Sequence, residues 1–378
     1  MLDETLLYNT YAQVDLDRIA HNYREIRNIL APTTELMCIV KANAYGHGAV
    51  EVARVLAREG ASMLGVATIA EGIELREAGI ALPILVLGGI QEQHVEAVVD
   101  YSLSQTVTNR EVLQRLSEYA QQSGKTPKVH IKIDTGMGRL GIRPGKELDS
   151  FLPVLKKCRN IEVEGVYTHF AASEDTDRSY TNLQMRRFKS AFKAFDEAGI
   201  KYKYRHCYNS AAIINHPELH TVFNLVRPGL ILYGYYPCDT WLKFINLKPV
   251  MQVKTKITFV KTIHPGDSVG YGRTFIADRA TKVATIGIGY ADGYSRRLSN
   301  VGYAIVKGKK VPLIGRISMD QCCLDVSEVE DVKLGDVVTL IGEDGEASIW
   351  ANDIAEMFGA IAAEVLTALG RRVLRTYK

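Results

Sequence analysis

Short apolar runs, many of them rich in β-branched residues, alternate with amphipathic stretches between residues 16 and 235. Eight runs predict buried strands: 37–40, 63–67, 84–87, 103–107, 129–134, 161–167, 204–208 and 225–227. In the stretches between them, apolar residues recur at i, i+3 and i+4, which is typical of helices with one buried face. These stretches are 16–30, 50–59, 71–78, 93–100, 110–122, 146–157 and 179–198. The alternation predicts an α/β fold, a (β/α)8 TIM-type barrel, with a doubly wound open sheet as the alternative.

The pattern changes after about residue 243, where strands follow one another without helices between them. Turn signals such as the His-Pro-Gly-Asp segment at 264–267 separate the predicted strands. The strands are 253–260, 282–287, 303–306, 310–313, 320–325 and 337–341, followed by one helical pattern at 349–358. The 378 residues therefore predict a barrel domain over 1–243 and a mostly β domain over 244–378. Residues 1–12 are candidates for pairing with the β domain.

Composition and charge exclude several classes of protein. Hydrophobic residues make up 47% of the chain and charged residues 24%, which is typical of a globular protein and unlike a disordered one. The net charge is +3, and no cluster of Lys and Arg with interleaved aromatic residues stands out, so we expect no nucleic-acid partner.

The cysteines and the N-terminus indicate a compartment. Six scattered cysteines form no Cys-x-x-Cys pair and have no histidine at zinc-finger spacing, which predicts buried thiols in a reducing compartment and no metal site. The first residues lack the basic and apolar regions of a signal peptide, and no run approaches the roughly 18 apolar residues that cross a bilayer. We expect a cytoplasmic chain without membrane contact. The cytoplasmic domain of a larger membrane protein would show the same pattern.

A lysine ends the first predicted strand of the barrel. Lys41 follows the apolar run and leads into a turn of small residues at 42–48. Active-site groups of such barrels lie at the C-terminal ends of strands, and desolvation there lowers the pKa of an amine, which suits Schiff-base formation. An ordinary lysine at a strand end is the alternative. At this segment the sequence resembles the alanine racemases, fold-type III enzymes that depend on pyridoxal 5'-phosphate (PLP), and the resemblance implies that Lys41 carries PLP.

The fifth predicted strand leads into a glycine-rich segment. Gly136, Gly138 and Gly141 match the G-x-G-x-x-G fingerprint of dinucleotide sites. We reject that interpretation because Pro144 follows, no helix opens at once, and the segment does not belong to the first βα unit. The resemblance implies instead that Arg139 approaches the phenolic oxygen of PLP and the substrate.

Lys132, on the same strand, matches a lysine that is often carbamylated in the family and pairs with the arginine. A carbamate would replace a buried cation by an anion and remove a conflict of like charges. An unmodified lysine is the alternative.

The sixth and eighth predicted strands contribute His169 and Arg227. In the family the arginine matching Arg227 faces the pyridine nitrogen of PLP, and the histidine matching His169 links it to a tyrosine. An arginine does not give up its proton in a protein. The resemblance therefore implies an unprotonated ring nitrogen and a cofactor that is a weaker electron sink than one facing an aspartate.

The phosphate of PLP is expected near the last two strands of the barrel, where barrel phosphate sites lie. Helix N-termini there favour anions. The residues assigned to this part of the cofactor site by the resemblance are Tyr45, Asn209, Ser210, Gly229 and Leu230. An asparagine and serine at a turn are, by themselves, most often a helix cap.

The β domain holds residues that the resemblance places in the active site of a partner subunit. Tyr271 matches the second catalytic base, and Met319 matches a residue whose backbone binds the substrate carboxylate. Four residues match those that line the access corridor to the active site in the family: Glu174, Tyr290, Arg296 and Arg316. At the position of Glu174 many members have aspartate. Most of the 19 tyrosines in such a chain are packing residues, so the assignment of Tyr271 rests on the resemblance.

One segment departs from the family. Where members commonly have Asn-Tyr-Glu, this chain has Ala362, Ala363 and Glu364. Ala363 thus replaces a tyrosine that contacts the phosphate and buries roughly 150–250 Å² of surface. Racemases of vancomycin-resistance clusters, similar to this family, also replace this tyrosine and accept serine. We therefore expect a wider substrate pocket.

The sequence as a whole predicts a PLP-dependent isomerase, a homodimer with active sites shared between subunits, that interconverts L- and D-alanine and supplies D-alanine for peptidoglycan. Lys41 and Tyr271 are the two expected bases. A serine or serine/alanine racemase is the alternative, and a fold-type III decarboxylase is a more distant one. The latter needs a triple-glycine phosphate loop and a substrate-binding cysteine motif, neither of which we find. A non-catalytic PLP carrier is another alternative. Such proteins end soon after the eighth strand, whereas this chain continues into a β domain that contains Tyr271.

Overall fold

The computed structural model describes residues 7–217, 222–237 and 245–378. The chain divides into two compact units. The barrel unit consists of residues 19–44 and 49–248, and the β unit consists of residues 1–18, 45–48 and 249–378. The domain boundary predicted at residues 243 and 244 lies outside the described residues. Among the described residues, no helix combines the length and the apolar character that crossing a bilayer requires.

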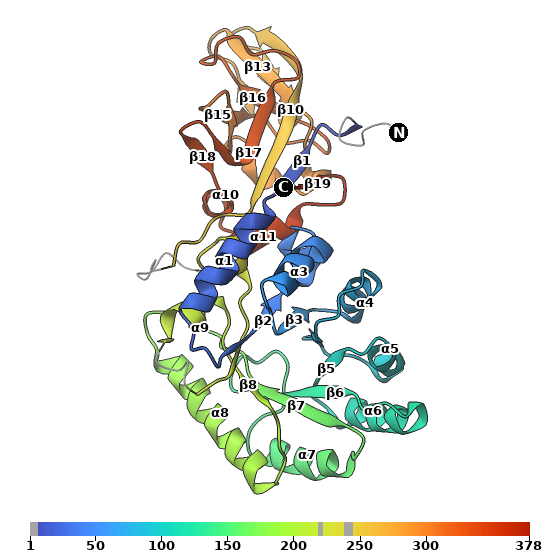
Figure 1. Ribbon diagram of the computed structural model, residues 1–378. Coiled ribbons are helices and arrows are strands. Elements are labelled where there is room, and N and C mark those ends of the chain that lie inside the picture. Colours follow the sequence, from blue (N-terminus) through green and yellow to red (C-terminus); the bar gives the residue numbers. More distant parts are fainter. Residues whose placement is uncertain (1–6, 218–221, 238–244) are drawn as a thin grey trace. The chain divides into compact units, whose positions relative to one another are not determined.

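The barrel unit is built on eight parallel strands (Figure 1). They are β2 (Glu35–Ile39), β3 (Met63–Val66), β4 (Ile84–Val86), β5 (Ser104–Val107), β6 (Lys128–Lys132), β7 (Glu162–Tyr167), β8 (Tyr204–His206) and β9 (Leu225–Val226). They run in the order β8-β7-β6-β5-β4-β3-β2-β9, so the last strand pairs with the first. Asn224 joins β9 to β8, because its side chain accepts from the amide of Arg205 and donates to the carbonyl of Lys203. The predicted TIM-type barrel is confirmed.

Helices cover the outside of this barrel (Figure 1). They are α1 (Leu16–Asn28), α3 (Ala49–Arg58), α4 (Ile69–Glu77), α5 (Val95–Asp100), α6 (Arg110–Ser123), α7 (Lys146–Lys157) and α8 (Ser179–Glu197). Each agrees with a predicted helix to within two residues at either end. Their apolar positions form one buried face, as in α6, where Val112, Leu113 and Leu116 are buried.

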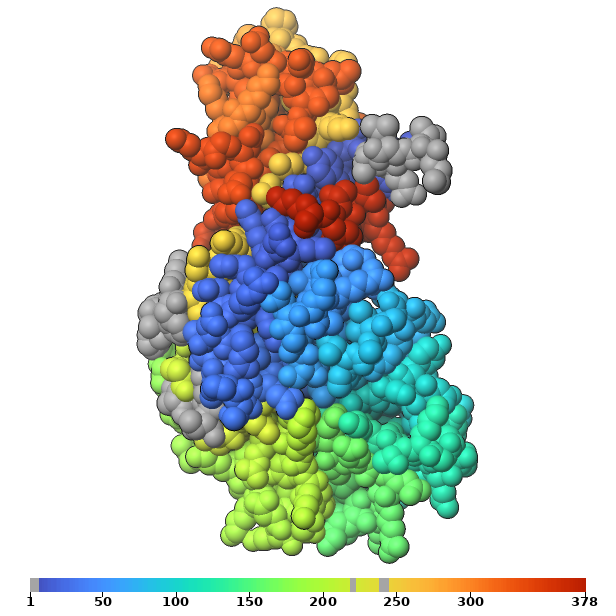
Figure 2. Space-filling view, viewed as in Figure 1, coloured from blue at the N-terminus to red at the C-terminus, as the bar shows by residue number. Residues whose placement is uncertain are grey.

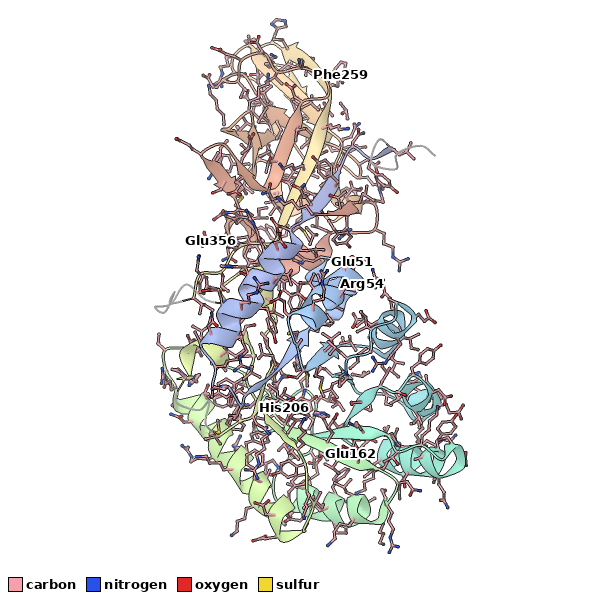
Figure 3. All side chains as sticks on the ribbon, viewed as in Figure 1. Glu51, Arg54, Glu162, His206, Phe259 and Glu356 are labelled. Atoms are coloured by element: carbon pink, nitrogen blue, oxygen red, sulfur yellow. The ribbon has the colours of Figure 1, made fainter. Side chains whose placement is uncertain are left out.

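The strands differ in what they place inside the barrel. β3 and β4 are apolar and fully buried, as expected of parallel strands covered on both faces. By contrast, β6 and β7 bury His130, Lys132 and Glu164. Residues two apart on a strand share a face, so His130 and Lys132 point to the same side of β6. His206, labelled in Figure 3, lies on β8, the strand that pairs with β7. The interior of the barrel is therefore charged and polar on one side.

The β unit contains a closed ring of six strands. These are β10 (Met251–Ile263), β13 (Thr281–Ile286), β14 (Tyr303–Val306), β15 (Lys309–Ile314), β16 (Cys322–Asp325) and β17 (Val337–Asp344). The ring closes because the long strand β10 pairs with β13 on one side and β17 on the other. Ile263, Val269, Ala277, Val283 and Ile314 form a buried cluster in this unit. Smaller elements are β11 (Ser268–Val269), β12 (Phe275–Ile276), β18 (Ala347–Ile349), α10 (Ala351–Phe358) and α11 (Ala362–Ala368).

Both ends of the chain add strands to the β unit. β1 (Tyr11–Val14) pairs antiparallel with β10 and parallel with β19 (Leu374–Tyr377). In Figure 2 the blue N-terminal residues lie between yellow and red residues of the same unit. The sheet thus joins segments from the beginning, the middle and the end of the sequence.

Candidate active site

Lys41 begins a left-handed turn directly after β2. The element α2 (Lys41–Tyr45) contains Ala42, Asn43 and Ala44 at φ values of 52°, 53° and 52°, and Tyr45 follows at 52°. A left-handed conformation costs a residue with a Cβ atom about 1–2 kcal/mol. Four such residues in a row require tertiary contacts that hold them in place.

Glu71 supplies two of these contacts. Its Oε1 atom accepts a hydrogen bond of 2.7 Å from the amide of Ala42, and its Oε2 atom accepts one of 2.7 Å from the amide of Ala67. Glu71 is also the third residue of α4 and forms a capping box with Thr68. One carboxylate therefore ties the lysine turn to the loop after β3. The sequence analysis did not identify Glu71, although the Thr-x-x-Glu spacing marks it as a cap.

Two lysines near the ends of barrel strands, Lys41 and Lys132, have amines with lowered pKa values. Burial lowers the pKa of Lys41, the positive charges of Arg139 and Arg227 lower it further, and Glu71 opposes them. Lys132 is 5% exposed, and burial together with Arg227 and Arg139 lowers its pKa to about 7. Its ammonium lies 5.3 Å from the centre of the Tyr167 ring. The structure thus brings two lysines and two arginines close enough to disturb one another's charge.

Arg227 lies in the barrel interior, 4% exposed. Its Nη1 atom is 2.8 Å from Nδ1 of His206, and its Nη2 atom is 3.1 Å from Nδ1 of His169. Nη2 also donates to the carbonyl oxygens of Thr168 and Cys207. Within the described residues, the Nη atoms make all the hydrogen bonds of this guanidinium and Nε–H makes none. Nε–H of a fixed cation is therefore available to a ligand.

His169 accepts from a cation and stays neutral. Burial lowers the pKa of His169 well below its usual range, and the charges of Arg227 and Lys132 act in the same direction. Since Nδ1 accepts from Arg227, the ring proton lies on Nε2. The predicted link between His169 and Arg227 is present as a direct contact.

The residues assigned to the phosphate lie around two short helical turns. Asn209 caps α9 (Ser210–Asn215), with its Oδ1 atom accepting from the amide of Ala212 at 2.9 Å. The hydroxyl of Ser210 accepts from the amide of Gly229 at 2.9 Å, and Leu230 begins the 3-10 helix that follows. The turns after β8 and β9 are thus joined.

Tyr45 and its neighbours belong to the β unit. Burial raises the pKa of Tyr45 to about 12. A Cβ atom on Gly46, whose φ is 84°, would lie 2.4 Å from the carbonyl oxygen of Leu366 in α11. This close approach of two backbones requires glycine at position 46.

Arg139 and Glu174 are exposed residues of the barrel unit. Arg139 lies on a loop held by Asp134, whose Oδ1 atom accepts from the amides of Gly136 and Gly138 at 3.0 Å each. These glycines shape the loop, and α7 begins at Lys146, after Pro144. The rejection of a dinucleotide site agrees with this geometry, since no helix N-terminus follows the glycines directly.

Tyr271 stands on a tight turn of the β unit and is 71% exposed. Gly270 and Gly272 flank it, each at a φ of 72°. A Cβ atom on Gly270 would lie 2.9 Å from the amide nitrogen of Arg316, and one on Gly272 would lie 3.0 Å from its guanidinium. Two of the predicted site residues, Tyr271 and Arg316, are therefore neighbours.

Met319 and Tyr290 lie on connected turns of the same unit. The amide of Tyr290 donates to the carbonyl of Ser318 at 3.1 Å, and the amide of Ala291 donates to that of Met319 at 3.0 Å. Met319 is 52% exposed and Tyr290 44% exposed. Arg296 begins the next turn, which the hydroxyl of Ser299 joins to the amide of Ile317.

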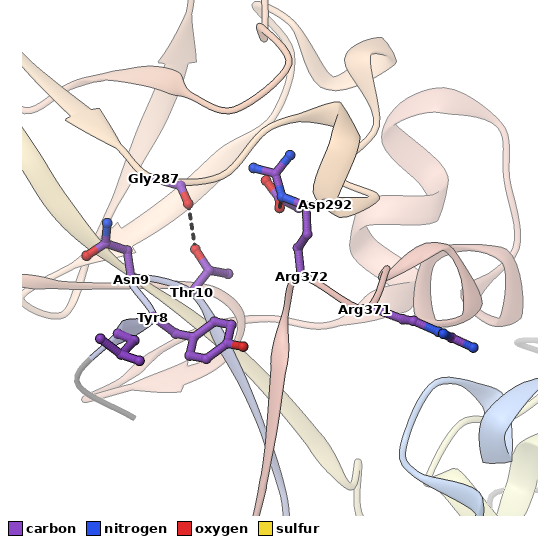
Figure 4. A pocket seen from close by; sticks show the side chains of 8 residues that line it. Tyr8, Asn9, Thr10, Gly287, Asp292, Arg371 and Arg372 are labelled. Atoms are coloured by element: carbon purple, nitrogen blue, oxygen red, sulfur yellow. Dashed lines mark hydrogen bonds and ion pairs between the residues drawn. The ribbon is translucent and has the colours of Figure 1, made fainter. Parts of the chain in front are cut away.

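The C-terminal segment supports the turn of Tyr290 from another side (Figure 4). The buried carboxylate of Asp292 is paired with Nε of Arg372 at 3.0 Å, and the amide of Gly370 donates to the carbonyl of Asp292. A pocket of about 420 Å³ is lined by Leu7, Tyr8, Asn9, Thr10, Gly287, Asp292, Arg371 and Arg372. Ala363, half-buried on α11, lies just before this segment.

The predicted site residues thus form two groups. Lys41, Lys132, Arg139, His169, Asn209, Ser210, Arg227, Gly229 and Leu230 belong to the barrel unit, together with the exposed Glu174. Tyr45, Tyr271, Tyr290, Arg296, Arg316, Met319 and Ala363 belong to the β unit. The sequence analysis missed Glu71, His130 and Glu164. The available signal for His130 and Glu164 was the presence of polar residues at alternate positions of buried strands.

Two family models match nearly all of the chain. The N-terminal domain of alanine racemase matches residues 14–237, and the C-terminal domain of alanine racemase matches residues 250–377. The chain is 45% identical to the alanine racemase of Carboxydothermus hydrogenoformans over 368 residues, which is 97% of this chain and 99% of that protein.

Solved structures of alanine racemases are also similar to this chain in fold. The alanine racemase of Clostridium difficile is 39% identical, with a TM-score of 0.93 over 98% of this chain and 96% of that one. The alanine racemase of Bartonella henselae, solved with covalently bound pyridoxal phosphate, is 31% identical, with a TM-score of 0.87 over 98% and 99%.

The buried amine of Lys132 predicts a pH dependence of stability. In the unfolded chain this lysine titrates near 10.5, and in the folded protein near 7. Between these values the unfolded state binds the extra proton, so the free energy of unfolding should rise with pH, by up to about 1.4 kcal/mol per pH unit. Denaturant titrations in buffer freed of carbon dioxide measure this rise. Lys132→Met is the control that removes the charge, and a constant difference between the two proteins from pH 7 to 10 would contradict the prediction.

Proposed function

The chain belongs to the alanine racemase family, and we propose that it is a PLP-dependent isomerase that interconverts L- and D-alanine. Similarity to alanine racemases over the full length of the chain supports the reaction. Two features of the barrel unit carry the assignment within the molecule: Lys41 is an amine with a lowered pKa, and Arg227 is a buried cation whose Nε–H makes no hydrogen bond within the described residues.

The residues of the barrel unit fit PLP. Nε–H of Arg227 suits the pyridine nitrogen as an acceptor, Lys41 suits the aldehyde, and the joined turns of Ser210 and Gly229 suit the phosphate. When bound, PLP supplies an electron sink that acidifies the Cα–H bond of an amino acid.

Arg227 decides how strong that sink is. A guanidinium can donate a hydrogen bond to the pyridine nitrogen but does not transfer its proton. The ring nitrogen of bound PLP would then stay unprotonated, and the cofactor would supply a weaker electron sink. A proton returned at Cα gives racemisation, whereas one delivered elsewhere gives transamination.

Lys41 and Tyr271 serve as the two bases. Burial and the charges of Arg139 and Arg227 lower the pKa of Lys41, which favours an amine that exchanges a proton. Tyr271 is exposed on its own unit and available to a second copy of the chain. We assign it to the active site of the partner subunit of a homodimer, where it faces the opposite side of the substrate. Met319 and Arg139 are assigned to the substrate carboxylate, and Glu174, Tyr290, Arg296 and Arg316 to the access corridor.

Lys132 is proposed to carry a carbamate. Its amine is deprotonated in part at neutral pH and lies among positive charges, which favours addition of carbon dioxide. The product would be an anion able to pair with Arg139. Bicarbonate should therefore raise the free energy of unfolding and extend its rise with pH to below pH 7, because the carbamylated lysine of the folded protein binds no proton whereas the free amine of the unfolded chain does.

Variants of the two bases test the function. L-alanine incubated with the protein and PLP should give D-alanine, resolved by chiral chromatography. Lys41→Ala and Tyr271→Phe should each lose nearly all turnover, because each removes one of two bases on opposite faces. Tyr303→Phe, which removes a hydroxyl from another exposed tyrosine of the β unit, should keep full activity. An active Lys41→Ala protein would refute the scheme.

Mixing the two inactive variants extends this test to the shared site. If Lys41 and Tyr271 of one site come from different subunits, each mixed dimer contains one intact site. Equal mixing after dissociation should then restore about a quarter of the wild-type activity. No recovery despite mixed dimers, detected by mass spectrometry, would place both bases on one subunit.

The substrate range is predicted to be wider than alanine because of Ala363. Restoring the aromatic ring with Ala363→Tyr should lower the ratio of serine to alanine turnover by about tenfold, the usual effect of filling a small volume in a substrate pocket. Ala368→Tyr, on an exposed position of the same helix, should leave the ratio unchanged. The prediction fails if both variants behave like the parent protein.

Three further expectations concern the setting. The five cysteines among the described residues are free, which supports a reducing, cytoplasmic location. Cys38, Cys207 and Cys322 are buried as predicted, whereas Cys158 and Cys323 are only half-buried. D-alanine made there would serve peptidoglycan synthesis. An association with vancomycin resistance stays a prediction. The domain boundary near residue 243 also stays a prediction.

A further inference from the structure

A continuous chain of hydrogen bonds runs from Arg227 through the barrel interior to a buried carboxylate. Nη1 of Arg227 contacts Nδ1 of His206 at 2.8 Å, and Nε2 of His206 contacts Nδ1 of His130 at 2.8 Å. Nε2 of His130 then contacts Oε2 of Glu164 at 3.1 Å. Glu164 is 4% exposed, and both histidines are fully buried.

The two ends of the chain fix the position of every proton between them. A guanidinium can only donate, so Nδ1 of His206 accepts and its proton lies on Nε2. His206 therefore donates to Nδ1 of His130, whose own proton must lie on Nε2. That proton meets a carboxylate, which can only accept. The chain is thus polarised in one direction, from Arg227 toward Glu164, with both imidazoles neutral.

The charge states agree with this direction. Burial lowers the pKa of both histidines. For His130 the hydrogen bond and the charge of Glu164 oppose this effect without reversing it, and for His206 the charge of Arg227 adds to it, so neither ring is expected to be charged at neutral pH. Burial alone would raise the pKa of Glu164, but its hydrogen bonds to His130, Lys128 and Ser104 outweigh that effect and lower the pKa to about 2.

Packing holds the imidazoles in place. The ring of Tyr167 stacks on His206 at 4.5 Å with an angle of 5° between the planes, and Tyr204 stacks on His130 at 6.1 Å. A Cβ atom on Gly165 would lie 2.4 Å from Nδ1 of His130. Neither ring can turn aside without moving the strands beside it.

We propose that Glu164 is a positioning residue for the racemase reaction, acting on Arg227 through His130 and His206. The inference rests on the proposed function. Its carboxylate sets both tautomers so that His206 presents an acceptor to Nη1 of Arg227. The anion also offsets the buried cation, and the fixed guanidinium keeps its free Nε–H directed at the ligand.

Lys128 makes this proposal testable. Its ammonium, a group that can only donate, contacts Oε1 of Glu164 at 3.1 Å, while His130 and Ser104 contact Oε2. In Glu164→Gln the amide oxygen must therefore face Lys128, and the NH2 group must face His130. That donor forces His130 and then His206 into the opposite tautomer, which turns an N–H toward the N–H of Arg227.

The experiment compares Glu164→Gln with the double variant Glu164→Gln/Lys128→Met in the PLP-loaded enzyme. Without Lys128 the amide can rotate and again offer its oxygen to His130. In the double variant the hydrogen bonds from Arg227 to residue 164 should therefore run in the same direction as in the parent protein. Lys128→Met alone is the matched control. Ring 15N NMR of labelled histidines reads the tautomers directly, in protein whose circular dichroism shows it to be folded.

We expect both His130 and His206 of the parent to carry the proton on Nε2, and both to carry it on Nδ1 in Glu164→Gln. The kcat for alanine should fall about 10- to 100-fold in Glu164→Gln with KM little changed, and should recover in the double variant, as expected for an unpaired buried donor.

Three results would overturn the proposal: Nδ1–H tautomers or charged rings in the parent, full activity in Glu164→Gln, or no recovery in a folded double variant. The tautomers of the parent decide the matter even if Glu164→Gln does not fold. They also do not depend on turnover, so a parent protein with the expected tautomers and no racemase activity would refute the proposed function and leave the hydrogen-bond chain standing.

Discussion

A guanidinium that is buried in the barrel and cannot lose its proton is the constraint to which the rest of the site conforms. Burying such a charge is costly unless it is paired and hydrogen-bonded. Arg227 lies against two neutral histidines and two backbone carbonyls, and the nearest anion along its hydrogen-bond chain is Glu164, beyond His206 and His130. The cation is therefore satisfied from one side, while its Nε–H is left for a ligand. A carboxylate in direct contact with Arg227 would offset more of the free-energy cost of burying the cation.

The same positive charge explains the state of the lysines. Arg227 and Arg139 lower the pKa of Lys41 and Lys132, which are already desolvated. For Lys41 this supports a role as an amine that exchanges a proton. For Lys132 it creates a conflict that carbamylation would relieve. Geometry adds a second constraint, since Lys41 starts four left-handed residues that Glu71 holds at their first amide. The barrel thus concentrates charge and backbone strain where strands β2, β6 and β9 end.

The sequence predicted much of the fold because the barrel is built from local patterns. Buried strands and amphipathic helices each show in a short window, so their limits agree with the structure to within two residues. The pairing of β1 with β19 could not be predicted in that way, because it joins residues more than 300 positions apart. A turn was predicted at 42–48 but its left-handed conformation was not, since among residues 42–45 only Asn43 is of a type that favours positive φ. Lys41 and Arg227 were found through motifs, whereas Glu164 and His130 emerged from the contacts inside the barrel.

The protonation state of the pyridine nitrogen provides the sharpest check on the role of Arg227. The protein can be loaded with PLP that carries 15N in the ring, and the chemical shift of that nitrogen can be followed by NMR through the neutral pH range. A guanidinium that donates a hydrogen bond and keeps its proton predicts the shift of an unprotonated, hydrogen-bonded pyridine at every pH at which the protein is folded. The shift of a protonated pyridinium would show that the cofactor is a strong electron sink and that Arg227 does not set its chemistry.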